Sequence, residues 1–96
     1  MVAKNPGNAL ARFGLANELL KAQLWEEAAE QLRAYLASHD DEGNAYGRLA
    51  EACVALGRID EAKDALRRGI AASERFGHPG MANELTGRLE DLEDSA

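Results

Sequence analysis

The sequence predicts an all-α protein, built as an α-solenoid of antiparallel helical hairpins with five helices. Three observations support this fold class. First, alanine, leucine, glutamate and arginine dominate the 96 residues, and these residues lose little rotamer freedom in a helix. Second, the β-branched and aromatic residues that favour strands are scarce. Third, a shift of 34 residues lays one segment of the chain onto the next, which is typical of a helical repeat.

The repeat consists of small and apolar residues that recur at steps of three and four. Residues at these steps share one face of a helix, so a pattern that occurs twice indicates that the same faces are buried twice. The identical pairs are Ala11 and Ala45, Leu15 and Leu49, Ala16 and Ala50, Glu27 and Glu61, Ala28 and Ala62, Leu32 and Leu66, Arg33 and Arg67, and Ala37 and Ala71.

The first hairpin is predicted at about 6–22 and 26–38. Pro6 suits the first turn of a helix, where its missing N–H is not needed. The apolar periodicity breaks at 22–24, and Trp25 is expected to open the second helix. The break therefore predicts a turn between two antiparallel helices.

The second hairpin is predicted at about 42–56 and 60–76. Asp40 or Asp41 is expected to cap its first helix, because a carboxylate can accept the unpaired N–H groups there. Gly57 is expected to end that helix in the left-handed conformation.

A fifth helix is predicted over 79–94, where the register of 34 fails after Gly77. One of its faces carries Met81, Leu85, Leu89 and Leu92, and the other carries Glu84, Arg88, Glu90, Asp91, Glu93 and Asp94. The apolar stripe is expected to cover the last hairpin while the charged back faces water, as an end cap requires. We therefore expect one domain over 1–96, with repeats at about 9–42 and 43–76 and a capping helix at about 79–94.

These residues resemble the tetratricopeptide repeat. The first copy of the pattern reads Arg12, Leu15, Ala16, Leu19, Ala28 and Leu32, and the second reads Tyr46, Leu49, Ala50, Cys53, Ala62 and Leu66. The resemblance implies a right-handed superhelix in which the repeated alanines lie where helix backbones approach closely. Arg12 departs from the aromatic residue usual at its position, and Asp40 and Glu74 stand where the proline often found near the end of a repeat would be.

The resemblance also implies a function, because tetratricopeptide repeats generally bind peptide segments of partner proteins on the concave face of their first helices. The candidate binding residues are Leu10, Phe13, Asn17, Leu20, Lys21, Asn44, Gly47, Arg48 and Glu51. The apolar members would anchor a partner, and the polar members would bind an extended peptide. A second interpretation is equally weighted: Phe13 and Leu10 pack on a neighbouring helix or on a second copy of the chain.

Some members of the family capture C-terminal carboxylates with Lys, Asn and Arg side chains on successive first helices. Here only Asn17 stands at a matching position. Phe13 replaces the lysine and Arg48 replaces the second asparagine, while Gly80 and Glu84 stand where further basic residues would be. Binding of chaperone tails is therefore not expected.

Composition excludes several other kinds of partner. The formal charge of −6 would repel a phosphate backbone, so nucleic acid is not expected. No stretch approaches the ~20 apolar residues of a membrane span, and the N-terminus lacks the apolar run of a secretory signal. The single cysteine, Cys53, allows no intrachain disulfide. We expect a cytoplasmic protein.

Catalytic chemistry is not expected either. Cys53 lies on the repeated packing face, which favours a buried small side chain over a nucleophile. His39 and His78 are expected at helix ends, without a cysteine or carboxylate at metal-ligand spacing on a shared face, and no glycine-rich phosphate loop is present. The sequence therefore predicts a non-catalytic module without a metal or cofactor, which binds a protein or peptide partner. The alternative is a homodimer module that uses the exposed face of the first helix.

Overall fold

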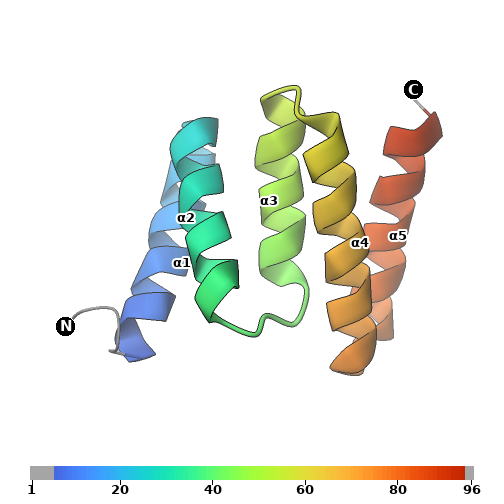
Figure 1. Cartoon of the computed structure of the whole chain (residues 1–96), viewed down its shortest axis with the longest axis horizontal. Helices are drawn as coiled ribbons and strands as arrows, with labels where there is room; N and C mark the ends of the chain where they lie inside the picture. Colours follow the sequence, from blue (N-terminus) through green and yellow to red (C-terminus); the bar gives the residue numbers. More distant parts are fainter. Residues whose placement is uncertain (1–5, 95–96) are drawn as a thin grey trace.

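The computed structural model describes residues 6–94 as a row of five α-helices (Figure 1). No strand occurs in this part of the chain, so the all-α prediction is confirmed. The helices are α1 (Pro6–Lys21), α2 (Trp25–Ser38), α3 (Asn44–Ala55), α4 (Ile59–Arg75) and α5 (Pro79–Asp94).

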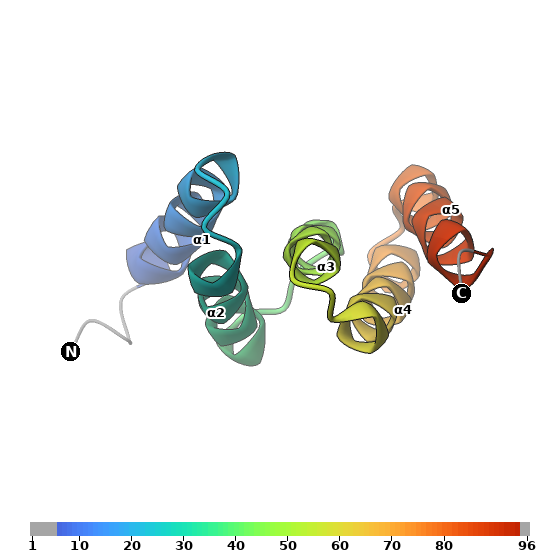
Figure 2. The same cartoon turned by 90° about the horizontal axis from the view of Figure 1, so that it is seen from above.

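The helices form a curved slab of 44 × 30 × 18 Å. The hairpin of α1 and α2 stands beside the hairpin of α3 and α4, and α5 packs against α4 (Figure 1). Figure 2 shows α1, α3 and α5 in one layer and α2 and α4 in the other. Within the first layer, α3 is set closer to the second layer than α1 and α5 are. The helices α1, α3 and α5 therefore line a concave face, and α2 and α4 form the opposite, convex face (Figure 2). The predicted helical solenoid is confirmed.

The helices α1, α3 and α4 each end in a tight turn of the same type, which we call a corner. In each, an N–H donates to the carbonyl five residues earlier: Leu24 to Leu19 at 2.9 Å, Arg58 to Cys53 at 2.8 Å and His78 to Ser73 at 2.8 Å. This pattern requires a left-handed residue just before the donor. The residues are Gly57 (φ 77°), as predicted, Gly77 (φ 76°), and Gln23 (φ 61°) in the first corner.

The loop between α2 and α3 is held by Asp41. One carboxylate oxygen, Oδ2, accepts the N–H groups of Gly43 at 2.8 Å and Ala45 at 2.9 Å, so Asp41 is the capping residue of α3. Gly43 has φ 128°, which a helix does not allow, and α3 therefore begins at Asn44, two residues later than predicted.

Alanine lines the contacts between the helices. Ala16, Ala28, Ala50 and Ala62 have no exposed surface, as their repeated positions predict, and Leu32, Leu49 and Leu66 are buried beside them. Small side chains let the helix axes approach closely, and their burial removes apolar surface from water. The core therefore runs along the slab between its two layers.

The prediction that Leu15 packs against another helix is wrong. Its side chain is 47% exposed, whereas its repeat counterpart Leu49 is 7% exposed. Leu49 faces the preceding hairpin, and no helix of residues 6–94 lies on the equivalent side of α1. We call this side the α1 edge; it carries Ala11, Leu15, Glu18, Ala22 and Leu24.

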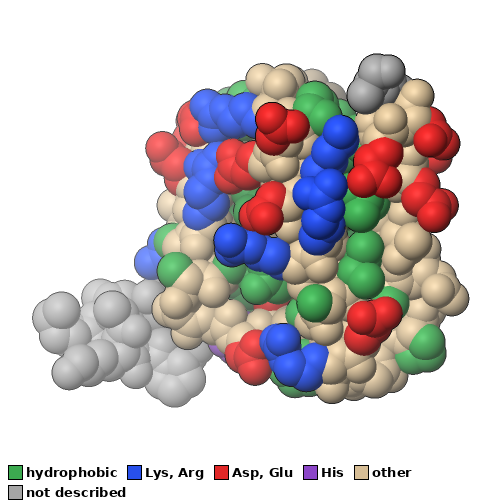
Figure 3. Space-filling model, turned by 45° about the vertical axis from the view of Figure 1, so that its right-hand side comes forward, with side chains coloured by type: hydrophobic (Ala, Val, Ile, Leu, Met, Phe, Trp, Pro, Cys, Tyr) green, Lys and Arg blue, Asp and Glu red, His purple; other side chains and the backbone are tan. Residues whose placement is uncertain are grey.

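Ion pairs tie the two hairpins together across the convex face, where acidic and basic side chains alternate (Figure 3). Arg58 pairs with Glu26 at 2.6 Å and Arg33 pairs with Glu61 at 2.7 Å. At the other end of the hairpins, Arg75 pairs with Asp40 at 2.9 Å. None of the five helices of residues 6–94 is both long and apolar enough to cross a membrane.

Candidate functional site

Three hollows follow one another over the concave face. The loop hollow, about 300 Å³, is lined by Leu10, Phe13, Tyr35, His39, Asp40, Asp41, Glu42, Asn44 and Met81. The central hollow, about 240 Å³, is lined by Gly43, Asn44, Gly47, Arg48, Glu51, Met81, Glu84, Leu85 and Arg88. The distal hollow, about 280 Å³, is lined by Ala50, Glu51, Val54, Leu66, Arg88, Asp91 and Leu92.

The hollows are joined by side chains that they share. Asn44 and Met81 line both the loop hollow and the central hollow. Glu51 and Arg88 line both the central hollow and the distal hollow. The three hollows are therefore neighbours along the concave face, and we call this row of hollows the concave groove.

Aromatic rings from α1 and α2 form the wall of the loop hollow. The ring of Phe13 lies 5.2 Å from that of Tyr35, which lies 4.7 Å from the ring of His39. Burial, with the nearby charges of Asp41 and Glu42, raises the pKa of Tyr35, so its phenol stays neutral. Leu10 is 70% exposed, so its apolar side chain is accessible to a ligand at the edge of the loop hollow.

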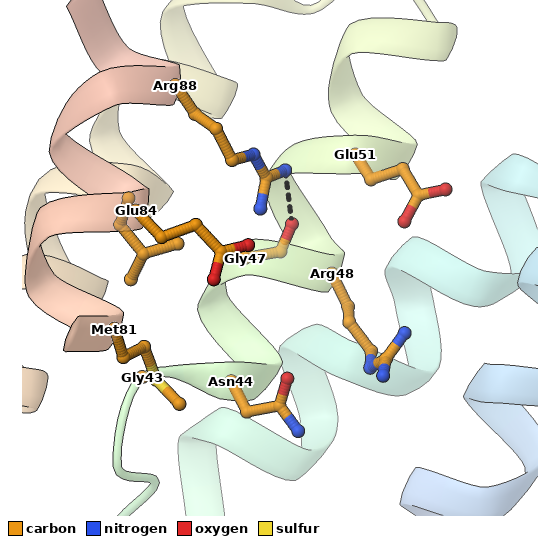
Figure 4. A pocket seen from close by; sticks show the side chains of 9 residues that line it. Gly43, Asn44, Gly47, Arg48, Glu51, Met81, Glu84 and Arg88 are labelled. Carbon is orange, nitrogen blue, oxygen red and sulfur yellow. Dashed lines mark hydrogen bonds between the residues drawn. The ribbon is translucent and has the colours of Figure 1, made fainter. Parts of the chain in front are cut away.

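The central hollow lies between α3 and α5, over a floor of glycine (Figure 4). Arg88 extends from α5 and donates from Nη2 to the carbonyl oxygen of Gly47 at 2.9 Å. A Cβ at Gly47 would lie 2.9 Å from Nη1 of Arg88 and 3.1 Å from Leu85. The glycine therefore lets α5 and its arginine approach the backbone of α3.

Charged side chains of both signs border the central hollow. Arg48 turns toward α1, where its guanidinium lies 5.9 Å from the centre of the Phe13 ring. Its Nε is buried without a hydrogen-bond partner, as is Oδ1 of Asn17. Within the described chain, Glu51 and Glu84 form neither hydrogen bonds nor ion pairs (Figure 4).

The structure brings most of the predicted binding residues to the groove. Leu10 and Phe13 line the loop hollow, and Asn44, Gly47, Arg48 and Glu51 line the central hollow. Asn17 is half-buried one turn along from Phe13.

Two predicted residues lie elsewhere. Leu20 is 7% exposed and belongs to the core, so its assignment as an apolar anchor for a ligand is wrong. Its position on α1 turns it toward the other helices rather than into the groove. Lys21 is exposed at the end of α1, where its ammonium lies 3.6 Å from a carboxylate oxygen of Glu18.

Several groove residues were not predicted, namely Tyr35 of α2, His39 directly after α2, and Met81, Glu84 and Arg88 of α5. The prediction that Arg88 faces water is wrong, because Arg88 is half-buried and donates to the carbonyl oxygen of Gly47. Glu84 is exposed, as predicted, and it also lines the central hollow. A signal was present in the sequence. The shift of 36 residues that lays Leu49 on Leu85 also lays Arg48 on Glu84, so the concave stripe continues onto α5.

Cys53, which the sequence predicts to be a buried small side chain rather than a nucleophile, lies outside the groove. Cys53 is fully buried, and this burial raises the pKa of its thiol to about 11, which leaves it protonated at neutral pH. The described residues contain no group of three or more His, Cys, Asp or Glu side chains placed to hold a metal ion.

Antiparallel hairpins stacked on alanine contacts, with a groove along their first helices, define a helical-repeat protein. Comparison with known proteins identifies the kind of repeat. A family model described as tetratricopeptide repeat matches residues 19–75. The chain is also 32% identical, over 93 residues, to the TPR repeat-containing protein PA0015 of Pseudomonas aeruginosa, in a match that covers 97% of this chain and 89% of that protein. No solved structure matches.

The chain belongs to the tetratricopeptide repeat family. Repeats of this family generally mediate interactions between proteins and are typically non-catalytic.

Proposed function

We propose that this chain is a non-catalytic interaction module that binds a peptide segment of a partner protein in the concave groove, and that it works in the cytoplasm. The row of three neighbouring hollows carries the proposal, because it runs along the concave face and adjacent hollows share lining side chains. An extended peptide can lie along such a groove, whereas a compact small molecule would fill one hollow only.

The groove offers both kinds of contact that peptide recognition uses. The exposed Leu10 and the half-buried Phe13 supply an apolar anchor at the loop hollow. Asn44, beside them, has an exposed amide that can donate to a peptide carbonyl and accept from a peptide N–H.

Photo-cross-linking tests this proposal directly. A photoreactive benzoylphenylalanine replaces Asn44 in the groove or, as a matched control, the exposed Glu30 of α2. In lysate of the native host, the groove position should capture a partner through one contiguous segment, mapped by mass spectrometry. A synthetic peptide of that segment should then bind the wild-type chain and bind Leu10→Ser and Phe13→Ala more weakly. Capture from position 30 but not from position 44 would exclude the concave groove.

Self-association through the α1 edge is the second candidate function, and the internal repeat favours it. In the second hairpin, Arg58 and Glu61 reach back to pair with residues of α2. Their counterparts in the first hairpin are Leu24, which is 45% exposed, and Glu27, which is exposed too. Together with Leu15, these residues present a stacking face that no helix of residues 6–94 covers.

A further inference from the structure

The side chains that line the concave groove carry an excess of negative charge. Six of them are carboxylates and two are guanidiniums: Asp40, Asp41, Glu42, Glu51, Glu84 and Asp91 against Arg48 and Arg88. The whole chain has a formal charge of −6, so the long-range field has the same sign as the groove. A positively charged segment is therefore attracted toward this face.

Most of the charged groups at the loop hollow already have partners. Asp40 pairs with Arg75, Asp41 caps α3, and Glu42 lies 2.6 Å from Nε2 of His78. These carboxylates strengthen the negative field, but they are occupied.

The central hollow differs, because there two carboxylates, those of Glu51 and Glu84, are left without hydrogen-bond or ion-pair partners among the described residues. Arg88 is held on the carbonyl oxygen of Gly47, and Arg48 is turned away toward Phe13. Glu84 extends from α5 across the hollow while Glu51 borders it from α3 (Figure 4). Within residues 6–94 neither glutamate pairs with either arginine. A cation that enters the hollow would meet two carboxylates ready to accept its hydrogen bonds.

Apolar side chains lie on both sides of this central hollow. The loop hollow contributes Leu10 and Phe13, and the distal hollow contributes Val54, Leu66 and Leu92. Val54 is 41% exposed, so it is available to a ligand. The groove thus offers apolar side chains on both sides of a central hollow that contains the two carboxylates, of Glu51 and Glu84, that are unpaired in the described part of the chain.

We infer that the partner segment is basic at its centre: a lysine or arginine of the peptide sits between Glu51 and Glu84, with apolar residues on either side of it in the loop and distal hollows. This inference rests on the proposed peptide-binding function and adds the chemical class of the peptide.

An array of synthetic peptides tests the inference. Each peptide has leucine near both ends and lysine, glutamine or glutamate at its centre, with alanine spacers of varied length between them. The wild-type chain should prefer lysine over glutamate, and the preference should weaken as salt is added, because these charges are partly exposed. Glu51→Gln and Glu84→Gln should each weaken binding to the lysine peptides by up to about fivefold.

Matched variants separate the possible outcomes. Glu30→Gln, on the convex side, should leave binding unchanged, and Glu84→Lys should shift the preference toward glutamate, with helicity by circular dichroism unchanged in each. Binding that requires Phe13 but is indifferent to the central residue, or that favours glutamate, would overturn the basic specificity and leave peptide binding intact. No binding to any peptide would contradict the proposed function and the inference together.

Discussion

Glu61 of α4 accepts two hydrogen bonds from the guanidinium of Arg33 on α2, at 2.7 and 3.0 Å. The two residues belong to different hairpins, so this bidentate pair links one repeat to the next. The hydrogen bonds from Arg33 lower the pKa of Glu61 below its ordinary value of 4.5. The pair is about two-thirds covered by its neighbours, which makes it stronger than a fully exposed pair.

Glu61→Gln should lower the free energy of unfolding at pH 7 by up to about 1 kcal/mol, the upper end for partly exposed ion pairs. A carboxylate with a lowered pKa stabilises the fold above its unfolded pKa, and this contribution is lost as the pH falls through the folded pKa. The difference between wild type and variant should therefore persist above pH 4.5 and shrink at lower pH. Urea denaturation across this range measures it. Glu30→Gln is the control, and an equal loss there would show that the ion pair contributes nothing specific.

Gly43→Ala should destabilise the fold by about 2–4 kcal/mol, because two costs add. The backbone has φ 128°, a conformation that side chains disfavour. The added Cβ would also contact Ser73, and it would lie 2.9 Å from the sulfur of Met81 and 3.0 Å from the carbonyl oxygen of Gly69. The midpoint of urea denaturation measures the effect.

Gly87→Ala is the matched control for that substitution. Gly87 lies within α5, and a Cβ there would have no neighbour within 4 Å. Alanine is the better helix former, so this variant should gain about 0.5–1 kcal/mol. Similar losses from both substitutions would contradict the account of the loop between α2 and α3.

Gln23→Gly should stabilise the protein by about 0.5–1 kcal/mol, although it removes a side chain. Gln23 occupies the left-handed position of the first corner (φ 61°), which glycine occupies in the other two. The reciprocal change, Gly57→Gln, should cost a similar amount. Thermal unfolding followed by circular dichroism compares the two variants, and a loss of stability in Gln23→Gly would contradict the equivalence of the corners.

Leu15→Asp should keep the chain monomeric at concentrations where the wild type dimerises, because it places a charge on the α1 edge. Sedimentation velocity over the micromolar range measures the change. Since Leu15 is half exposed, the substitution should leave helicity nearly unchanged. Wild-type protein that sediments as a monomer throughout would eliminate self-association while leaving peptide binding untouched.

Much of the fold could be predicted because equivalent residues of the two repeats make the same packing contacts. Ala16 and Ala50 are both fully buried where helices approach closely. Gly57 adopts the left-handed conformation at the end of α3, and Gln23 does so at the equivalent position of the first hairpin. The α1 edge could not be predicted in this way. Periodicity identified Leu15 as a residue of a packing face, but only the tertiary arrangement decides whether another helix covers that face.

The groove was only half predictable for a related reason. Its α1 and α3 residues follow one helical stripe and could be found by register. The 36-residue shift also places Glu84 of α5 on this stripe, whereas the position of Arg88 depends on its hydrogen bond to Gly47, which lies 41 residues away in the sequence. That contact arises because α5 folds back on α4 and brings its first turns beside α3. No local pattern distinguishes such an arginine from one that faces water.

The central claim is that the concave face, rather than the convex face or the α1 edge, receives a peptide. An NMR titration of the ¹⁵N-labelled chain with the peptide selected on the array tests it most directly. The account predicts that chemical-shift changes centre on the amides of Asn44, Gly47, Glu51 and Arg88, while those of Glu30 and Asp64 on the convex helices stay in place. Changes centred on α2 and α4, or on Leu15 and Leu24, with the groove amides unmoved, would contradict it.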